Sequence, residues 1–302
     1  MSEIRFQRLR DLPTQHLLGT GTSMCAGCGG LQAFHQAYDI LGADTVVVNA
    51  AGCMTLLTVY PFTPMAGSWL YTSMASAPAG AQGVRDALDL RRGRGQEANL
   101  VNLDVVVLTG DGAAYGMGLS STSAAIERGL DFLYFCYDNE GYGNTGQQAS
   151  GATPHGARTA TTPAGFLGGK KDLFAIWAAH RPAYVATVIG SEPLDLARKI
   201  EKAKSLRGPR LILALSPCPT GWDFDPAETA EIGRLAVRTG IWPLKEYVDG
   251  RIVHTKLPHP RLPVADYLRK QGRFAHLFRP SGETMLAEIQ AQVDAYWAAV
   301  KE

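Results

Sequence analysis

Short apolar runs alternate with segments of helical spacing along most of the chain. The apolar runs predict buried strands at residues 45–49, 105–108, 132–137, 183–189 and 210–215, the last of these being the final strand. The spacing of apolar residues predicts helices at 32–41, within 73–90, and at 120–128, 172–180 and 193–204. Strands that alternate with helices favour an α/β fold, with a mainly parallel sheet covered by helices on both faces.

The pattern changes after Trp242. Four prolines, Pro243, Pro258, Pro260 and Pro263, interrupt regular structure until an amphipathic helix is predicted at 283–300. We therefore expect a main domain at 1–240 and a C-terminal extension at 241–302, which forms an arm that packs on a partner subunit.

Two polar segments are predicted to be loops. Residues 91–97 are basic and are expected to be solvated. Residues 150–171 are rich in glycine, threonine and proline, and the segment is long enough to be a functional loop and not a plain connection. Lys170 and Lys171, at the end of this loop, are interpreted as surface charge.

Composition narrows the class of protein. The chain has 302 residues, of which 46% are hydrophobic and 19% charged, and its formal net charge is +1. These values are ordinary for a folded protein and give no indication of nucleic-acid binding. The N-terminus lacks the apolar core of a signal peptide, and no segment reaches the ~18 apolar residues of a membrane span. We expect a cytoplasmic protein whose thiols stay reduced.

Polar residues follow two of the predicted strands. Asp111 comes directly after strand 105–108, between Gly110 and Gly112, and Asn139 comes directly after strand 132–137. If these strands are parallel neighbours, their ends bring Asp111 and Asn139 side by side. Oxygen ligands with a single carboxylate suit Mg²⁺ bound to a diphosphate, and glycines let the backbone approach phosphate closely. This pairing predicts a thiamine diphosphate protein.

The motif has two other interpretations. In a dinucleotide site of the GxGxxG type, the third glycine would stand where this chain has Tyr115. An ordinary Asp-Gly turn is common for a GDG triplet, but it does not account for the matching second strand. The spacing therefore favours the diphosphate site.

The five cysteines divide into two groups. Cys136 lies inside strand 132–137 and is predicted to be a small core residue. The other four lie in turn-like surroundings, where glycines allow a loop to wrap a metal cluster. On spacing alone, the CxxC pair is compatible with a redox dithiol or half of a zinc site, and four cysteines bind zinc as readily as iron. A neighbouring thiamine, which needs an electron acceptor, favours iron and sulfur. The four are Cys25, Cys28, Cys53 and Cys218.

Several of these residues are expected at one edge of the sheet. Cys53, Asp111, Asn139 and Cys218 each follow a predicted strand. In parallel sheets ligands bind beyond the carboxyl ends of the strands. The sequence therefore predicts that both candidate sites share one rim.

Taken together, the motifs resemble the β subunit of pyruvate:ferredoxin oxidoreductases, and the resemblance runs almost end to end. The chain has the sequences CAGCG at 25–29, NAAGC at 49–53, GDG at 110–112, YDNE at 137–140, NTG at 144–146, GATP at 151–154, SPCPTGW at 216–222 and YLRKQGRF at 267–274.

This resemblance implies roles for individual residues. Cys25, Cys28, Cys53 and Cys218 would ligate a 4Fe-4S cluster. Asp111, the Asn139 side chain and the Gly141 carbonyl would hold magnesium, and Asn144 would lie close to the thiazolium ring and the substrate as the candidate catalytic residue. The expected residues for cofactor binding are Gly110, Asp111, Gly112, Asn139, Gly141, Asn144 and Thr145. Glu140 is expected to serve the hydrogen bonds of its own loop.

The implied activity is oxidative decarboxylation of a 2-oxoacid, with single electrons passed to the cluster and the acyl group released to coenzyme A. In the family, an α-type subunit supplies the glutamate at the aminopyrimidine and most contacts to the substrate. The expected partners also include γ and ferredoxin-like δ subunits, and ferredoxin or another electron acceptor.

The substrate is less sharply indicated. Many pyruvate-type relatives carry a Phe-Glu-Asn-Ala-like sequence where this chain has Met-Ala-Ser-Ala at 74–77. Pyruvate is the default, and phenylglyoxylate or another larger 2-oxoacid is the alternative, because an enlarged apolar pocket discriminates by only about 1–3 kcal/mol per methylene. His155, in the 150–171 loop, is a candidate contact to substrate or coenzyme A. Two other functions stay open: a thiamine decarboxylase without redox function, and a zinc-bound scaffold.

Overall fold

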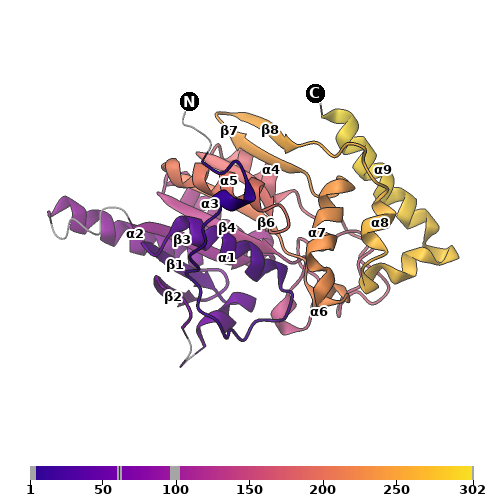
Figure 1. The fold of residues 1–302 in the computed structure, drawn as a ribbon, viewed down its shortest axis with the longest axis horizontal. Coiled ribbons are helices and arrows are strands. Elements are labelled where there is room, and N and C mark those ends of the chain that lie inside the picture. Colours follow the sequence, from indigo (N-terminus) through magenta and orange to yellow (C-terminus); the bar gives the residue numbers. More distant parts are fainter. Residues whose placement is uncertain (1–4, 60, 62, 96–102, 301–302) are drawn as a thin grey trace.

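One twisted sheet organises the protein. The computed structural model describes residues 5–59, 61, 63–95 and 103–300, and within them eight strands lie in the order β2-β1-β3-β4-β6-β5-β7-β8 (Figure 1). The first six strands of this order run parallel, β7 pairs antiparallel with β5, and β8 pairs antiparallel with β7. The strands are β1 (Thr45–Ala50), β2 (Ser68–Thr72), β3 (Asp104–Gly110), β4 (Phe132–Asp138), β5 (Tyr184–Ile189), β6 (Pro209–Leu215), β7 (Leu244–Val248) and β8 (Arg251–Lys256).

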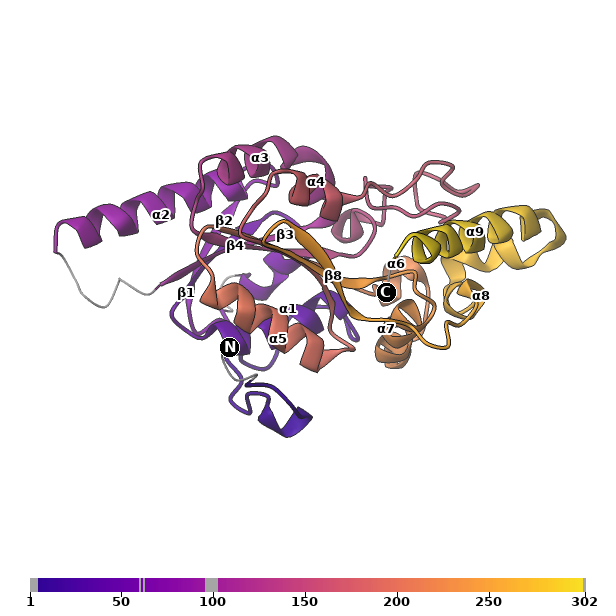
Figure 2. The same ribbon diagram turned by 90° about the horizontal axis from the view of Figure 1, so that it is seen from above.

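Helices cover both faces of the sheet. In Figure 2, α2, α3 and α4 lie above it and α1 and α5 lie below it. Alternate residues of β3 accordingly belong to two separate cores: Val105 and Val107 pack with the first set of helices, and Val106 and Leu108 with the second. The helices are α1 (Gly29–Leu41), α2 (Ala77–Gly93), α3 (Leu119–Glu127), α4 (Leu173–Ala179), α5 (Pro193–Ser205), α6 (Pro219–Trp222), α7 (Thr229–Arg238), α8 (Val264–Leu268) and α9 (Glu283–Ala299).

The predicted α/β architecture is confirmed. The five expected strands are β1, β3, β4, β5 and β6, and the expected helices are α1 to α5 and α9. Burial on both faces explains why the central strands are continuous apolar runs. Cys136 is fully buried in β4, as predicted. The first three residues of the predicted basic loop 91–97 belong to α2, and its last two lie outside the described residues.

Three strands were missed. β2 is a short edge strand with an exposed face, so it carries no apolar run. The prediction that 210–215 is the final strand is wrong, because β7 and β8 follow it. The prolines of this segment led to that prediction, but Pro243 stands just before β7, and Pro258 and Pro260 come after β8, where proline does not interrupt a ladder.

The predicted C-terminal extension also contributes to the main body. Besides adding β7 and β8, it places Tyr267, Phe274 and Leu277 in the core shared with α2, α3 and α4. α9 buries mainly Ile289 and Val293 and lies at the edge of the molecule (Figure 1). Packing of this segment on a partner subunit stays a proposal. No described helix is long and apolar enough to cross a membrane.

At the amino ends of the strands, a buried arginine joins three elements. Arg210 is 1% exposed, and it donates to the carbonyls of Phe132 (3.2 Å), Gly208 (3.0 Å) and Leu206 (3.0 Å). Its guanidinium also donates to Asp131 Oδ1 at 2.9 Å. The ends of α5, β4 and β6 are therefore tied together by one side chain.

Replacing this arginine should be costly. Arg210→Met leaves buried carbonyls without this donor and removes one of the donors to Asp131, so we expect the free energy of unfolding to fall by about 3 kcal/mol. Arg207, which approaches the same Asp131 but is 69% exposed, is the matched control, and Arg207→Met should cost less than about 1 kcal/mol. Urea unfolding of the two variants measures both values, and equal losses would contradict this account.

Candidate functional site

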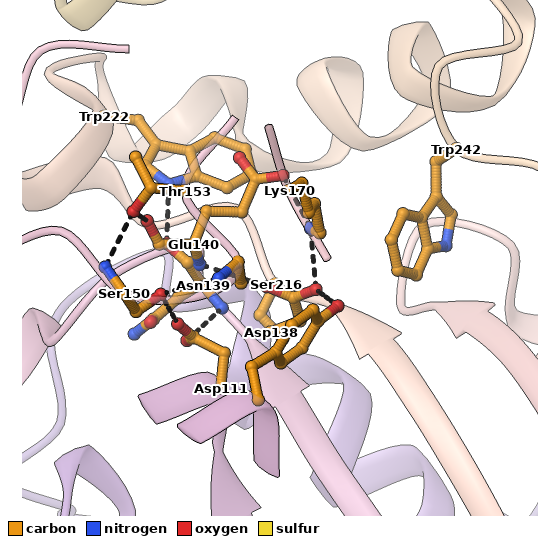
Figure 3. Close-up of polar contacts among 12 residues, drawn as sticks. Asp111, Asp138, Asn139, Glu140, Ser150, Thr153, Lys170, Ser216, Trp222 and Trp242 are labelled. Carbon is orange, nitrogen blue, oxygen red and sulfur yellow. Dashed lines mark hydrogen bonds and ion pairs between the residues drawn. The ribbon is translucent and has the colours of Figure 1, made fainter. Parts of the chain in front are cut away.

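The carboxyl end of β3 carries a fully buried acid. Asp111 accepts hydrogen bonds from the backbone N–H of Asn139 (3.2 Å) and from the Ser150 hydroxyl (Figure 3). Burial raises the pKa of the Asp111 carboxyl well above its usual value, and the nearby Asp138 raises it further. No Lys or Arg forms an ion pair with Asp111 among the described residues. The ionised form of Asp111 therefore has no paired cation among these residues.

Three oxygen-bearing groups converge beside this acid. One end of the Asn139 carboxamide lies 2.8 Å from both Asp111 Oδ1 and the Gly141 carbonyl oxygen. With nitrogen at that end the amide donates to both groups. With oxygen there, the amide nitrogen faces Cys53 Sγ at 3.8 Å, and three oxygens face one another. Adjacent ligands of octahedral Mg²⁺, bound at ~2.1 Å, lie ~3.0 Å apart, so the second orientation fits a magnesium ion.

Glycine is required in this motif by close contacts with the next loop. A Cβ atom on Gly112 would lie 2.2 Å from the Tyr142 ring, and one on Gly141 would lie 2.5 Å from the Gln147 amide. The sequence interpretation assigned Gly110 and Gly112 to the approach of phosphate alone. In the structure, the packing of the β4 loop onto the β3 end already demands small residues here.

The predicted cofactor residues line one cavity. It has a volume of about 220 Å³, and its wall includes Gly110, Gly112, Asn139, Gly141, Asn144 and Thr145. Asp111 lies buried beside this wall. Asn144 is exposed, and Thr145 donates to the Tyr142 carbonyl at 3.3 Å. Met74, from the divergent 74–77 segment, also lines the cavity.

The four loop cysteines line a second cavity of about 140 Å³. Cys28 caps α1 and accepts the N–H of Leu31 at 3.4 Å, and Cys218 accepts the N–H of Gly221 at 3.4 Å. The two cavities share a wall that contains Cys53, Asn139, Gly143 and Asn144. Any group bound by the cysteines is thus separated by one layer of residues from the cavity beside Asp111.

The sulfur spacing argues against a single zinc ion. Four thiolates around zinc, with bonds of ~2.3 Å, stand ~3.8 Å apart. No three of the four cysteines, all of them among the described residues, have sulfurs within 4.8 Å of one another. Burial is the main cause that raises the pKa of the Cys53 thiol to about 12, and the neighbouring thiols raise it further. Ionised thiolates here need a cationic group, and the wider spacing suits one larger than a single ion.

Most of the segment that forms this rim of the sheet matches a known protein family. The family model described as thiamine pyrophosphate enzyme, C-terminal TPP binding domain, matches residues 50–214, which include Cys53, Asp111 and Asn139. A pyruvate synthase subunit PorB from Methanothermobacter marburgensis is 43% identical, over 94% of this chain and 97% of that protein. The chain belongs to the thiamine diphosphate-binding subunits of the 2-oxoacid:ferredoxin oxidoreductases. The ketoisovalerate oxidoreductase subunit VorB of Pyrococcus abyssi is 35% identical, over 98% of this chain and 96% of that protein.

A solved structure shares the fold. The 2-oxoglutarate:ferredoxin oxidoreductase of Magnetococcus marinus, solved with 2-oxoglutarate, coenzyme A and succinyl-CoA bound, superposes with a TM-score of 0.57 at 21% identity. The match covers 78% of this chain and 84% of that one. At this identity it supports the architecture alone.

Beneath the Asn139 loop of this oxidoreductase subunit lies an ion network that the sequence did not predict. Lys170 Nζ lies 2.7 Å from Asp138 Oδ2 and 2.9 Å from Glu140 Oε1 (Figure 3). Arg273 lies 2.6 Å from Glu140 Oε2. Tyr115 donates its hydroxyl to Asp138. Two carboxylates are thus paired with two cations, and Asp111 is left outside the pairing.

Two expectations need correction. Lys170 is not surface charge: burial opposes its ammonium, but Asp138 and Glu140 raise its pKa. Glu140 serves more than its own loop, because its side chain ties Lys170 and Arg273 together. Burial opposes its charge, and these two cations hold the pKa of the Glu140 carboxyl below its usual value. No local pattern reveals partners 30 and 133 positions away.

His155 faces a different cavity from the one beside Asp111. That cavity has a volume of about 380 Å³ and is lined also by Lys170 and Trp242. The His155 ring lies 3.3 Å from Glu288 and 3.4 Å from the Gly168 carbonyl. The suggested contact with substrate or coenzyme A stays a prediction, and the cavity beside Asp111 does not include His155 in its wall.

The adjacent lysines provide a direct test of the network. Lys170→Met removes the cation shared by two buried carboxylates and should lower the free energy of unfolding by about 3–5 kcal/mol. Lys171, whose ammonium donates to the neutral Tyr115 carbonyl at 2.8 Å, is the control, and Lys171→Met should cost at most about 1.5 kcal/mol. Urea unfolding measures both. Indistinguishable losses would show that Lys170 does not hold the loop.

Proposed function

We propose that this chain is the subunit of a 2-oxoacid:ferredoxin oxidoreductase in which decarboxylation and the first electron transfer take place. Asp111, the Asn139 carboxamide and the Gly141 carbonyl would hold Mg²⁺ and, through it, the diphosphate of thiamine diphosphate. Cys25, Cys28, Cys53 and Cys218 would hold a 4Fe-4S cluster. The observation that carries the proposal is the wall shared by the two cavities.

The residues of the chain suit these tasks. When bound, thiamine diphosphate supplies the electron sink for the departing carboxylate. Asp111 brings a charge that a cation must balance, and Gly110 and Gly112 border the cavity that would receive the diphosphate. The exposed Asn144, at the cavity wall, is placed to donate a hydrogen bond to a substrate oxygen. Cys53 and Asn139 lie in the shared wall, so electrons would cross a single layer of residues.

The cavity also indicates a missing partner. None of the described residues that line it is acidic, so this part of the chain offers no carboxylate for the aminopyrimidine. Tyr71 and Leu70 of edge strand β2 are 55% and 42% exposed, and Tyr71 lines the cavity. We propose that an α-type subunit covers this edge and supplies the glutamate and the remaining substrate contacts. By the same resemblance, γ and ferredoxin-like δ subunits complete a cytoplasmic complex that reduces ferredoxin or another acceptor.

Pyruvate is the proposed substrate, with coenzyme A as the acyl acceptor. The most similar relatives described above include a pyruvate synthase subunit at 43% identity and a ketoisovalerate oxidoreductase subunit at 35%. Met74 at the cavity wall, where many pyruvate-type relatives carry a larger aromatic residue, keeps phenylglyoxylate or another larger 2-oxoacid as the alternative.

A substrate panel tests this proposal. The native complex, purified without oxygen, is assayed with each 2-oxoacid, coenzyme A and a viologen dye, while iron and thiamine are measured in the same sample. We expect dye reduction to be fastest with pyruvate. Faster reduction with phenylglyoxylate or a branched 2-oxoacid would replace the substrate and keep the chemistry. Absence of both thiamine and iron would overturn the proposal.

The cluster assignment has a matched cysteine pair. Cys218→Ala removes a proposed ligand, whereas Cys136→Ala removes a buried sulfur from β4 that has no such role. We expect the first variant to lose about one cluster of iron per chain and at least about 100-fold in dye reduction while it still binds thiamine diphosphate. The Cys136→Ala variant should keep its iron content and its rate of dye reduction. Full turnover by Cys218→Ala would favour a non-redox decarboxylase, and zinc without iron in the native protein would favour a scaffold.

A further inference from the structure

A second set of metal-ligating side chains lies on the flank of α1, away from the candidate site. His35 and Asp39 stand one turn apart on this helix, and His16 approaches them from the segment before it. His16 Nδ1 lies 3.1 Å and His35 Nε2 lies 3.5 Å from Asp39 Oδ2. All three ligand atoms lie within 4.8 Å of one another. The function proposed above makes no use of these residues.

The distances match those of a first coordination shell. Nitrogen and oxygen ligands bound to zinc at ~2.0–2.1 Å in a tetrahedron are ~3.3 Å apart. The two measured separations, 3.1 and 3.5 Å, lie on either side of that value. The four cysteines show no comparable convergence, so the spacing distinguishes the two sets of ligands.

The state of each ligand supplies an independent observation. His35 Nε2 is buried and has no hydrogen-bond partner, although it faces the Asp39 carboxylate. Asp39 is itself held in place, because its Oδ1 accepts the backbone N–H of Leu17 at 2.9 Å and its side chain is only 7% exposed. A backbone donor on the second oxygen is the usual support for a metal-binding carboxylate. An ion between these groups would satisfy the orphaned nitrogen.

We propose that His16, His35 and Asp39 bind a divalent transition-metal ion of the zinc type. Imidazole nitrogens and one carboxylate are the ligands that such ions prefer. His16 is 64% exposed, so solvent can reach the fourth coordination position.

The placement of the site suggests a structural role for the ion. Leu17 and Gly19, just after His16, both pair with the segment before β2. Ala66 N donates to the Leu17 carbonyl at 3.2 Å, and Gly19 N donates to the Pro64 carbonyl at 2.8 Å. The chain then runs to Cys25 and on to Cys28, which caps α1. The ion would fasten the start of this cysteine-bearing segment to the helix at which the segment ends.

Metal counting on matched variants tests the proposal. The anaerobically purified complex is dialysed against Zn²⁺, and bound zinc is measured for the wild type, His16→Asn, His35→Asn and the control His259→Asn, an exposed histidine outside the cluster. All four proteins carry the same cysteines, so differences report on the histidine site. We expect His259→Asn to match the wild type and each of the other two to bind one zinc fewer per chain.

A second readout separates metal binding from altered folding. Zinc should slow protease cleavage between residues 17 and 28 of the wild type by about tenfold, and it should have no effect on His16→Asn, in which an exposed side chain is changed. Equal zinc content in the wild type and His16→Asn would overturn the proposal, as would cleavage of the wild type that does not respond to zinc. Contact between the histidines and Asp39 without a metal would give both of these results.

Discussion

The negative charge of Asp111 is the constraint on which the candidate site depends. Three carboxylates, Asp111, Asp138 and Glu140, are buried where β3 and β4 end, and an unpaired buried charge is costly. Lys170 and Arg273 compensate Asp138 and Glu140. With the Asn139 amide oxygen turned toward it, Asp111 has only a hydroxyl and a backbone N–H as donors, and a cation beside it would balance its ionised form. In this account, the metal is required by the electrostatics of the protein as well as by the diphosphate.

The same network explains how distant parts of the chain build one loop. Lys170 comes from the long polar loop and Arg273 from the C-terminal segment, and both reach Glu140, whose backbone has a positive φ of 62°. The Arg273 guanidinium carbon also lies 3.9 Å from the centroid of the Trp222 ring, and the Trp222 indole N–H donates to the Asn139 carbonyl at 2.8 Å. The segment after residue 240 therefore supports the candidate magnesium ligands in addition to extending the sheet.

The sequence predicted the parts of the structure that local patterns encode. Continuous apolar runs identified the buried strands, and the polar residues directly after them, Asp111 and Asn139, do meet at one rim because parallel strands end together. Strands β2 and β8 were missed because their exposed residues leave no apolar run, and β7 was missed because polar residues alternate with its apolar ones and prolines flank the hairpin. The roles of Lys170, Glu140 and Arg273 were missed for another reason. Their pairing is a property of tertiary structure, and next to Lys171 the half-buried Lys170 has the sequence context of a surface charge.

The central claim is that the cation beside Asp111 binds the cofactor diphosphate and lies close to the cysteine-bound cluster. Electron paramagnetic resonance of the native complex, with Mn²⁺ in place of Mg²⁺, tests it most directly. The account predicts a Mn²⁺ signal that requires thiamine diphosphate, shows coupling to phosphorus nuclei, and broadens when the cluster is reduced. A bound Mn²⁺ that shows neither phosphorus coupling nor any response to cluster reduction would contradict it.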